Sequence, residues 1–115
     1  MSSIAVREQE IVEDFELFSE WEEKYQYIIE LGQKLKPLSA EYKTDECKIK
    51  GCQSSVWIHA LEKDDTIVFE ADSDSVFVKG IIALLIQVLS GERPQEIIDA
   101  QLGFIEAIGL KQHLA

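Results

Sequence analysis

The chain has 115 residues, of which 46% are hydrophobic and 29% are charged. This balance is typical of one globular domain with a modest core, and it excludes a disordered chain. The formal net charge of −11 argues against nucleic acid as a partner, because phosphate binding requires a positive surface.

The amino-terminal third predicts two helices in a hairpin. Apolar residues recur at helical spacing among acidic ones over residues 4–18, which indicates an amphipathic helix. Ser19 followed by Glu22 has the form of a capping box, so a second helix is expected to begin at Glu20. Pro37 closes that element.

The middle of the chain predicts a small antiparallel sheet. Residues 38–49 have the composition of a turn region, whereas residues 55–63 and 66–72 are rich in β-forming residues. A short turn of two aspartates joins these two strands, and Ile49 is a candidate start for a third. A meander of about three strands is too small to be stable alone, so helices are expected to cover one face.

The rest of the chain predicts helices and completes an α+β fold. Residues 73–75, Ser-Asp-Ser, offer capping oxygens to Val76–Leu89, which is apolar nearly all round and is expected to be the central buried helix. Residues 94–100 and 102–108 are expected to form short C-terminal helices. The apolar run is too short to cross a bilayer, and the acidic amino terminus lacks the pattern of a signal peptide, so we predict a cytoplasmic protein.

The most distinctive stretch is Lys50-Gly51-Cys52-Gln53-Ser54. Gly51 permits backbone angles that other residues avoid, so a sharp bend here would present the Cys52 thiol outward. Residues 31–52 carry five lysines against three acids, which makes this segment the electropositive part of an acidic chain. Neighbouring cations favour the reactive thiolate. The alternative interpretation of a free cysteine is a small buried hydrophobe.

Two other kinds of site have weaker support. A thiol hydrolase would need a base, and only His59 and His113 are available; His59 has the pattern of a half-buried structural residue on a strand. A metal site would need three or four converging soft ligands, whereas the chain has Cys47 and Cys52 without a C-x-x-C pattern. We therefore predict no resident cofactor and no metal. The alternative function that stays open is a small iron–sulfur or zinc scaffold using both cysteines and a histidine.

Four groups of residues, taken together, are specific to one known family. The groups are Glu23-Lys24-Tyr25 with Ile28-Ile29-Glu30-Leu31-Gly32, Lys50-Gly51-Cys52-Gln53-Ser54 with Val56-Trp57, Asp72-Ser73-Asp74 with Val78-Lys79-Gly80, and Gln112-His113-Leu114. In this order, and over residues 21–114, they resemble the SufE family of sulfur-acceptor proteins. The resemblance implies the α+β fold that this family shares with U-type cluster scaffolds.

The resemblance also implies a function. Cys52 matches the family's sulfur-accepting cysteine, which takes the outer sulfur from the persulfide of a pyridoxal-phosphate-dependent cysteine desulfurase. The acceptor then carries that sulfur toward iron–sulfur cluster assembly, to a scaffold or another acceptor. The protein would be an accessory of the desulfurase rather than a stand-alone enzyme, and pyridoxal phosphate would belong to the partner.

The residues next to the thiol are expected to contact the desulfurase: Lys48, Lys50, Gly51, Gln53 and Ser54. We expect no membrane partner, and we expect a monomer or a weak homodimer. Family members continue beyond the Gln-His-Leu group into a final helix, whereas this chain stops at Ala115. The expectation is therefore a single SufE-like domain over residues 1–115 without that helix.

Overall fold

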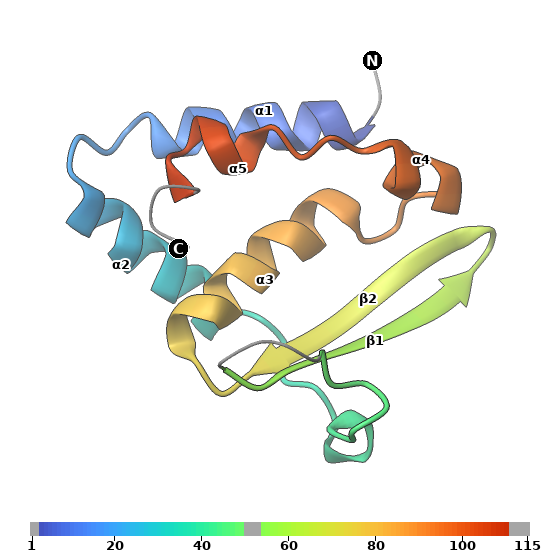
Figure 1. The fold of residues 1–115 in the computed structure, drawn as a ribbon. Coiled ribbons are helices and arrows are strands. Elements are labelled where there is room, and N and C mark those ends of the chain that lie inside the picture. The colour runs from blue at the N-terminus through green and yellow to red at the C-terminus, as the bar shows by residue number, and fades with distance from the viewer. Residues whose placement is uncertain (1–2, 50–53, 111–115) are drawn as a thin grey trace.

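The computed structural model describes residues 3–49 and 54–110. Within these residues, five α-helices, one short 3-10 helix and a two-stranded antiparallel sheet follow the order α1-α2-η1-β1-β2-α3-α4-α5. Figure 1 shows that α1 and α5 lie on one side of α3, whereas the sheet lies on the other. The predicted α+β class is confirmed.

Helices α1, Ser3–Phe15, and α2, Trp21–Gln33, form an open hairpin. Helix α1 ends short of the predicted residue 18, because Phe18 leaves the helix to contact Tyr27 of α2. The ring centroids of Phe18 and Tyr27 are 5.2 Å apart, and those of Phe15 and Tyr27 are 5.3 Å apart. These three rings hold the corner between the two helices.

Helix α2 begins with a capping box that lies one residue later than predicted. Glu20 is the N-cap residue, and the carboxylate of Glu23 accepts a hydrogen bond from the Glu20 N–H at 3.2 Å. The Ser19 hydroxyl donates to the same carboxylate at 3.4 Å. Ser19 therefore supports the cap from outside the helix instead of forming it.

The sheet consists of β1, Val56–Lys63, and β2, Thr66–Ser73, in antiparallel pairing. The two residues of the connecting turn, Asp64 and Asp65, have φ angles of 50° and 65°. Positive φ at both central positions is what a type I′ hairpin requires, and aspartate tolerates it better than most residues. The predicted hairpin between the two strands is confirmed.

The expectation of about three strands is wrong: the described residues hold two strands and two isolated bridges, one beside β1 and one beside β2. The interactions beside β1 are a bridge between Lys48 and Trp57 and backbone hydrogen bonds from Ile49 to Val56 (2.8 Å) and from Ile58 to Cys47 (2.9 Å). Pairing goes no further toward the amino terminus, because the preceding chain turns into the 3-10 helix η1, Ala40–Tyr42.

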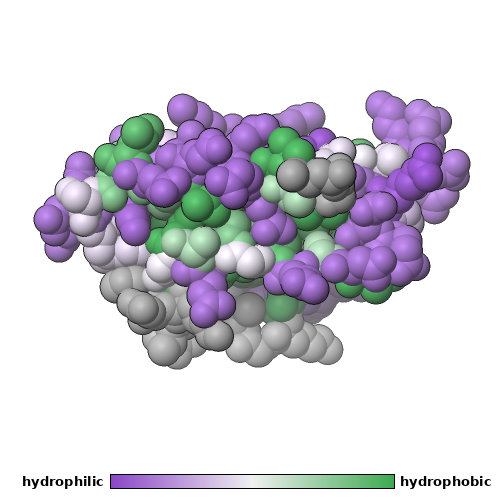
Figure 2. Space-filling view, turned by 90° about the horizontal axis from the view of Figure 1, so that it is seen from above, coloured by the Kyte–Doolittle hydropathy of each residue, from purple (hydrophilic) through white to green (hydrophobic). Residues whose placement is uncertain are grey.

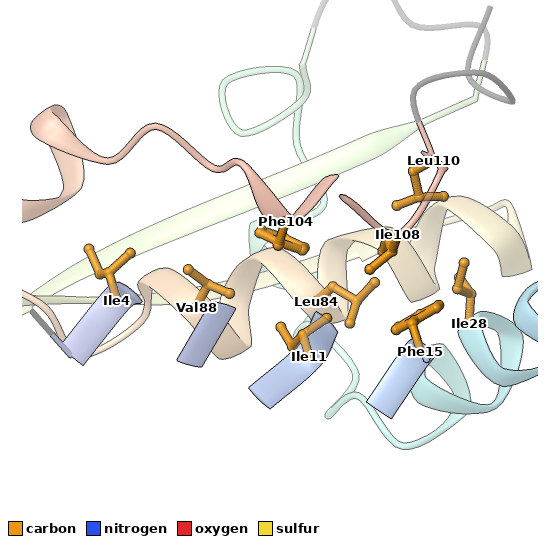
Figure 3. Packing of buried hydrophobic residues seen from close by; sticks show 9 residues of the cluster. All are labelled: Ile4, Ile11, Phe15, Ile28, Leu84, Val88, Phe104, Ile108 and Leu110. Carbon is orange, nitrogen blue, oxygen red and sulfur yellow. The ribbon is translucent and has the colours of Figure 1, made fainter. Parts of the chain in front are cut away.

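Helix α3, Val76–Leu89, has the predicted bounds and forms the middle layer. The Ser75 hydroxyl accepts a hydrogen bond from the Val78 N–H at 3.3 Å, so the predicted N-cap is confirmed. Toward the other helices, α3 contributes to a core whose buried members Figure 3 labels: Ile4, Ile11, Phe15, Ile28, Leu84, Val88, Phe104, Ile108 and Leu110. Toward the sheet, it forms a smaller cluster with Val56 and Ala71 through Ile82.

The last two helices, α4 (Pro94–Asp99) and α5 (Phe104–Ala107), are short, and α5 packs against α1. Figure 2 shows the molecule from the side of α1 and α5, where hydrophilic residues cover most of the surface and hydrophobic ones show between them. No helix among the described residues has both the length and the apolar character needed to cross a membrane.

Helices α2 and α3 approach each other closely at a pair of glycines. A Cβ atom built on Gly32 would lie 2.7 Å from the backbone nitrogen of Gly80, and one built on Gly80 would overlap the carbonyl oxygen of Ile28. A gap of 2.7 Å is shorter than any ordinary carbon contact. Glycine is therefore required at both positions to let the two backbones meet.

This contact predicts the effect of a small substitution. Changing Gly80 to Ala should lower the free energy of unfolding by about 1–3 kcal/mol, because the new methyl group pushes the helices apart. The helix propensity of alanine, about 1 kcal/mol better than glycine, offsets part of this loss. Urea unfolding measures the difference, with Gln87→Ala on the exposed side of α3 as the control. An unchanged or higher stability for Gly80→Ala would refute the close contact.

Candidate functional site

The predicted site residues fall partly outside the described part of the chain. Lys50, Gly51, Cys52 and Gln53 all lie outside the described residues. Of the other two predicted contact residues, Lys48 is exposed and Ser54 is half-buried. The structure therefore shows how the chain enters and leaves residues 50–53, which we call the acceptor segment.

The chain that leaves the acceptor segment is held at Ser55 by the connection between β2 and α3. The Ser55 carbonyl accepts hydrogen bonds from the Ser73 hydroxyl at 2.8 Å and from the Asp74 N–H at 3.2 Å. The Ser55 N–H donates to the Asp74 carboxylate at 3.0 Å. Both backbone polar groups of Ser55 are thus satisfied, which fixes the point where the segment ends.

The chain that enters the acceptor segment is held by the bridge beside β1. The Ile49 N–H donates to the carbonyl of Val56, and the Ile58 N–H donates to the carbonyl of Cys47. Ile49 and Val56 are therefore neighbours across this pairing. The chain therefore leaves this pairing at Ile49 and rejoins it at Val56, at the same end of β1, with six residues in between.

Strand β2 carries a buried carboxylate at this end of the sheet. Asp72 is 4% exposed, and it forms ion pairs with Lys43 at 3.2 Å and with Lys79 at 3.4 Å. Its Oδ1 also accepts a hydrogen bond from the Ser73 N–H at 2.8 Å. We call Lys43, Asp72 and Lys79 the ion triad. It joins three parts of the fold: the loop after η1, strand β2 and helix α3.

The ion triad controls the protonation state of Asp72. Burial by itself raises the pKa of this carboxyl, but the Ser73 N–H and the two lysines outweigh burial, so the pKa lies below its ordinary value. Asp72 is therefore ionised at neutral pH. With two ammonium groups and one carboxylate, the triad carries a net charge of +1.

Sequence reasoning missed the triad. It placed Asp72 at the end of the second predicted strand and counted Lys43 only among the five lysines of residues 31–52, whereas Lys43 pairs with Asp72 and lies 5.6 Å from the centre of the Trp57 ring. The available signal was Lys79, a single cation inside an otherwise apolar helix. A partly buried lysine needs a carboxylate partner, but its spacing in the sequence did not show which one.

His59 is a structural residue in this arrangement. It is half-buried, its Nδ1 lies 3.3 Å from the Glu70 carboxylate, and its ring stacks on Tyr42 at 3.7 Å between centroids. The carboxylate of Glu41 is the main cause that raises the pKa of Tyr42. His59 is thus engaged on both its edge and its face, as expected for a structural histidine. His113, the other predicted candidate, lies outside the described residues.

Cysteines, histidines and carboxylates are the side chains that could bind a metal in the described part of the chain. Cys47 is a free thiol of intermediate burial. No three of the histidines, cysteines and carboxylates within residues 3–49 and 54–110 come together as a metal-binding group.

Comparison with known proteins identifies the family. Residues 9–115 match SufE, described as the Fe-S metabolism associated domain. This match covers most of the chain, so the protein belongs to the SufE family. Its family membership associates it with Fe–S metabolism.

Three relatives show how far the similarity extends. An uncharacterized SufE-like protein of Rhizobium meliloti is 40% identical over 112 residues, which is 92% of this chain and 79% of the relative. SufE-like protein 1, chloroplastic/mitochondrial, of Arabidopsis thaliana is 42% identical over 93% of this chain but only 29% of its own length. An uncharacterized SufE-like protein of Synechocystis is 40% identical over 90% of this chain and 65% of its own.

The relatives also bear on location. The name of the Arabidopsis protein describes it as chloroplastic/mitochondrial, so the relatives are not all cytoplasmic proteins. A cytoplasmic location for this chain therefore stays a prediction.

The low pKa of Asp72 predicts a pH dependence of stability. A carboxyl whose pKa falls below its unfolded value of 3.8 stabilises the fold fully above that value, and the contribution is lost as pH falls through the folded pKa. Asp72→Asn should lower the unfolding free energy at pH 7 by about 1–3 kcal/mol. The difference from wild type should shrink as pH falls from about 5 toward the folded pKa.

Urea unfolding at several pH values between 7 and 3 tests this dependence. Asp65→Asn at the exposed hairpin turn is the matched control, and it should track the wild type at every pH. A constant difference between Asp72→Asn and wild type down to pH 3 would show that the charge of Asp72 does not stabilise the fold.

Proposed function

We propose that this protein is a sulfur acceptor and activator of a pyridoxal-phosphate-dependent cysteine desulfurase, and that Cys52 carries the sulfur as a persulfide. The observation that carries the proposal is membership of the SufE family together with Lys50-Gly51-Cys52-Gln53-Ser54, the group of residues that resembles the family's acceptor site. The sulfur would pass to an iron–sulfur scaffold or another acceptor, in keeping with the association with Fe–S metabolism.

The chemistry is an exchange of thiol–disulfide type. The Cys52 thiolate attacks the outer sulfur of the persulfide on the desulfurase. A new S–S bond forms on Cys52, the S–S bond of the donor persulfide breaks, and the desulfurase cysteine leaves as a thiolate. Sulfur is transferred without an external oxidant or reductant. The acceptor needs no cofactor of its own for this step.

The geometry around the acceptor segment supports this role. A thiol that enters another protein's active site must project from a fixed point of attachment, because orientation contributes much of the rate of such a reaction. The hydrogen bonds of Ile49 to β1, and of Ser55 to the residues that connect β2 to α3, provide that attachment. Lys48 is exposed and lies two residues before the acceptor segment. A cation near the thiol would favour a thiolate.

The alternative function, a small iron–sulfur or zinc scaffold, draws no support from the described residues. His59 would have to leave both Glu70 and Tyr42 to bind a metal. This alternative becomes an outcome of the test below.

Mass spectrometry tests the acceptor role. After incubation with a cysteine desulfurase and cysteine, the intact protein should gain the mass of one or more sulfur atoms, and a thiol reductant should remove it. Cys52→Ser should abolish the gain, whereas Cys47→Ser should preserve it. A gain that depends on Cys47 instead would reject the site. One tightly held metal per chain that is lost in Cys52→Ser would favour the scaffold function.

A second prediction concerns Lys48 as a contact for the desulfurase. Lys48→Glu should reduce stimulation of the desulfurase several-fold at low salt, because charge complementarity acts mainly on the association rate. The effect should fade as salt shortens the Debye length to about 8 Å at physiological strength.

Lys63→Glu provides the matched control for Lys48→Glu. Lys63 is exposed and lies at the opposite end of β1 from the bridge to Lys48, about 20 Å away at the rise of a strand. Sulfide release over a salt series compares the two variants. Equal activity of both at every salt concentration would show that Lys48 is a solvated residue outside the docking surface.

A further inference from the structure

Burying the charged side chain of Asp72 at this position costs free energy. A buried ion pair gains little stability over a well-packed apolar pair, because removing charges from water costs about as much as their attraction returns. Asp72 nevertheless takes two lysines and a backbone N–H. On the same face of the sheet, its cross-strand partner Trp57 is partly exposed. The arrangement is therefore better suited to holding parts of the fold in register than to adding stability.

The ion triad holds the chain that enters the acceptor segment. Tyr42 and Lys43 contact two cross-strand pairs that are neighbours on one face of the sheet. Tyr42 stacks on His59, whose partner is Glu70. Lys43 contacts Trp57 and Asp72. The loop after η1 is thereby fastened to the outer face of the sheet. From there the chain passes through the bridge beside β1 and into the acceptor segment.

The same carboxylate also organises the chain that leaves the acceptor segment. Asp72 accepts the N–H of Ser73, and the Ser73 hydroxyl donates to the carbonyl of Ser55. Asp74 binds Ser55 through its own N–H and carboxylate. Lys79 ties Asp72 to the first turns of α3. The chain is therefore connected to Asp72 on both sides of the acceptor segment, through Lys43 before it and through Ser73 and Ser55 after it.

We propose that Asp72 is a positioning residue for sulfur transfer: between Lys43 and Lys79, its carboxylate sets the positions of Ile49 and Ser55, through which the chain leads into and out of the acceptor segment. This inference rests on the proposed function. Asp72 acts through Lys43 on the entering chain and through Ser73 on the leaving chain.

Substitutions can separate the charge from the shape of the triad. Asp72→Asn keeps the size of the side chain and an oxygen that accepts the Ser73 N–H, but it loses both ion pairs. Lys43→Met keeps the aliphatic stem on Trp57 and loses the charge. Lys43→Arg keeps a cation that can pair with the carboxylate. A positioning role predicts that Asp72→Asn and Lys43→Met fail in the same way and that Lys43→Arg rescues.

The experiment is single-turnover sulfur transfer from a persulfidated desulfurase, measured over a range of acceptor concentrations. Asp72→Asn and Lys43→Met should lower the maximal transfer rate about tenfold or more, because a small displacement of a reacting group is costly. The half-saturating acceptor concentration should change much less. The double variant should be no slower than Asp72→Asn, since the two residues act as one unit.

Two control variants show how much of any change in transfer rate comes from lower stability or from the loss of a lysine charge alone. Val88→Ala opens a cavity in the main core, away from the sheet, and lowers stability by a route that spares the triad. Lys63→Met removes an exposed lysine at the far end of β1. Both should transfer sulfur at the wild-type rate at a temperature where every variant is folded, as shown by circular dichroism and urea unfolding.

The outcomes distinguish this inference from the function on which it rests. If the wild type accepts no sulfur, the proposed function fails and the inference fails with it. If the wild type accepts sulfur and Asp72→Asn matches it, or is no slower than Val88→Ala, the positioning role is overturned. Should Asp72→Asn not fold, Lys43→Met decides, because the Lys43 side chain is 38% exposed and tolerates replacement.

Discussion

The contact between α2 and α3 at Gly32 and Gly80 sets the position of the remaining elements. It allows α3 to lie in the middle of the fold, with the larger core on one side and the smaller sheet cluster on the other. A wider spacing would displace the first turns of α3, where Lys79 forms its ion pair with Asp72. It would also displace the connection before α3, where Ser73 and Asp74 form hydrogen bonds with Ser55. The packing of two helices thus determines the geometry at the base of the acceptor segment.

The ion pairs of the buried Asp72 lie at one end of this layered structure. The larger core contains apolar residues only, whereas the end of the sheet that leads to Cys52 holds the ion triad and the hydrogen bonds of Ser55. This division would suit the proposed chemistry, which depends on one thiol. The core supplies stability, and the polar end would fix the residues that border the acceptor segment.

The sequence predicted the elements with strong local signals. Helix α3 combines an apolar run with a Ser75 cap, and the hairpin combines two β-rich segments with paired aspartates, so their predicted positions agree with the structure. Features that depend on distant contacts were missed: α1 ends early because Phe18 contacts Tyr27, and the third strand is reduced to a bridge. Lys43 and Lys79 meet at Asp72 only in the folded chain. Cys52 was assigned from its local pattern and a family resemblance, and it lies outside the described residues.

The central claim is that Cys52 is the residue that receives sulfur, and the chain allows a direct test. Cleavage after Lys48 and Lys50 places Cys47 and Cys52 in separate tryptic peptides. The unaltered protein would be incubated with a desulfurase and cysteine that contains a heavy sulfur isotope, then alkylated and digested without reductant. The account predicts heavy sulfur on the peptide that contains Cys52. Heavy sulfur confined to the Cys47 peptide, or absent from both, would contradict it.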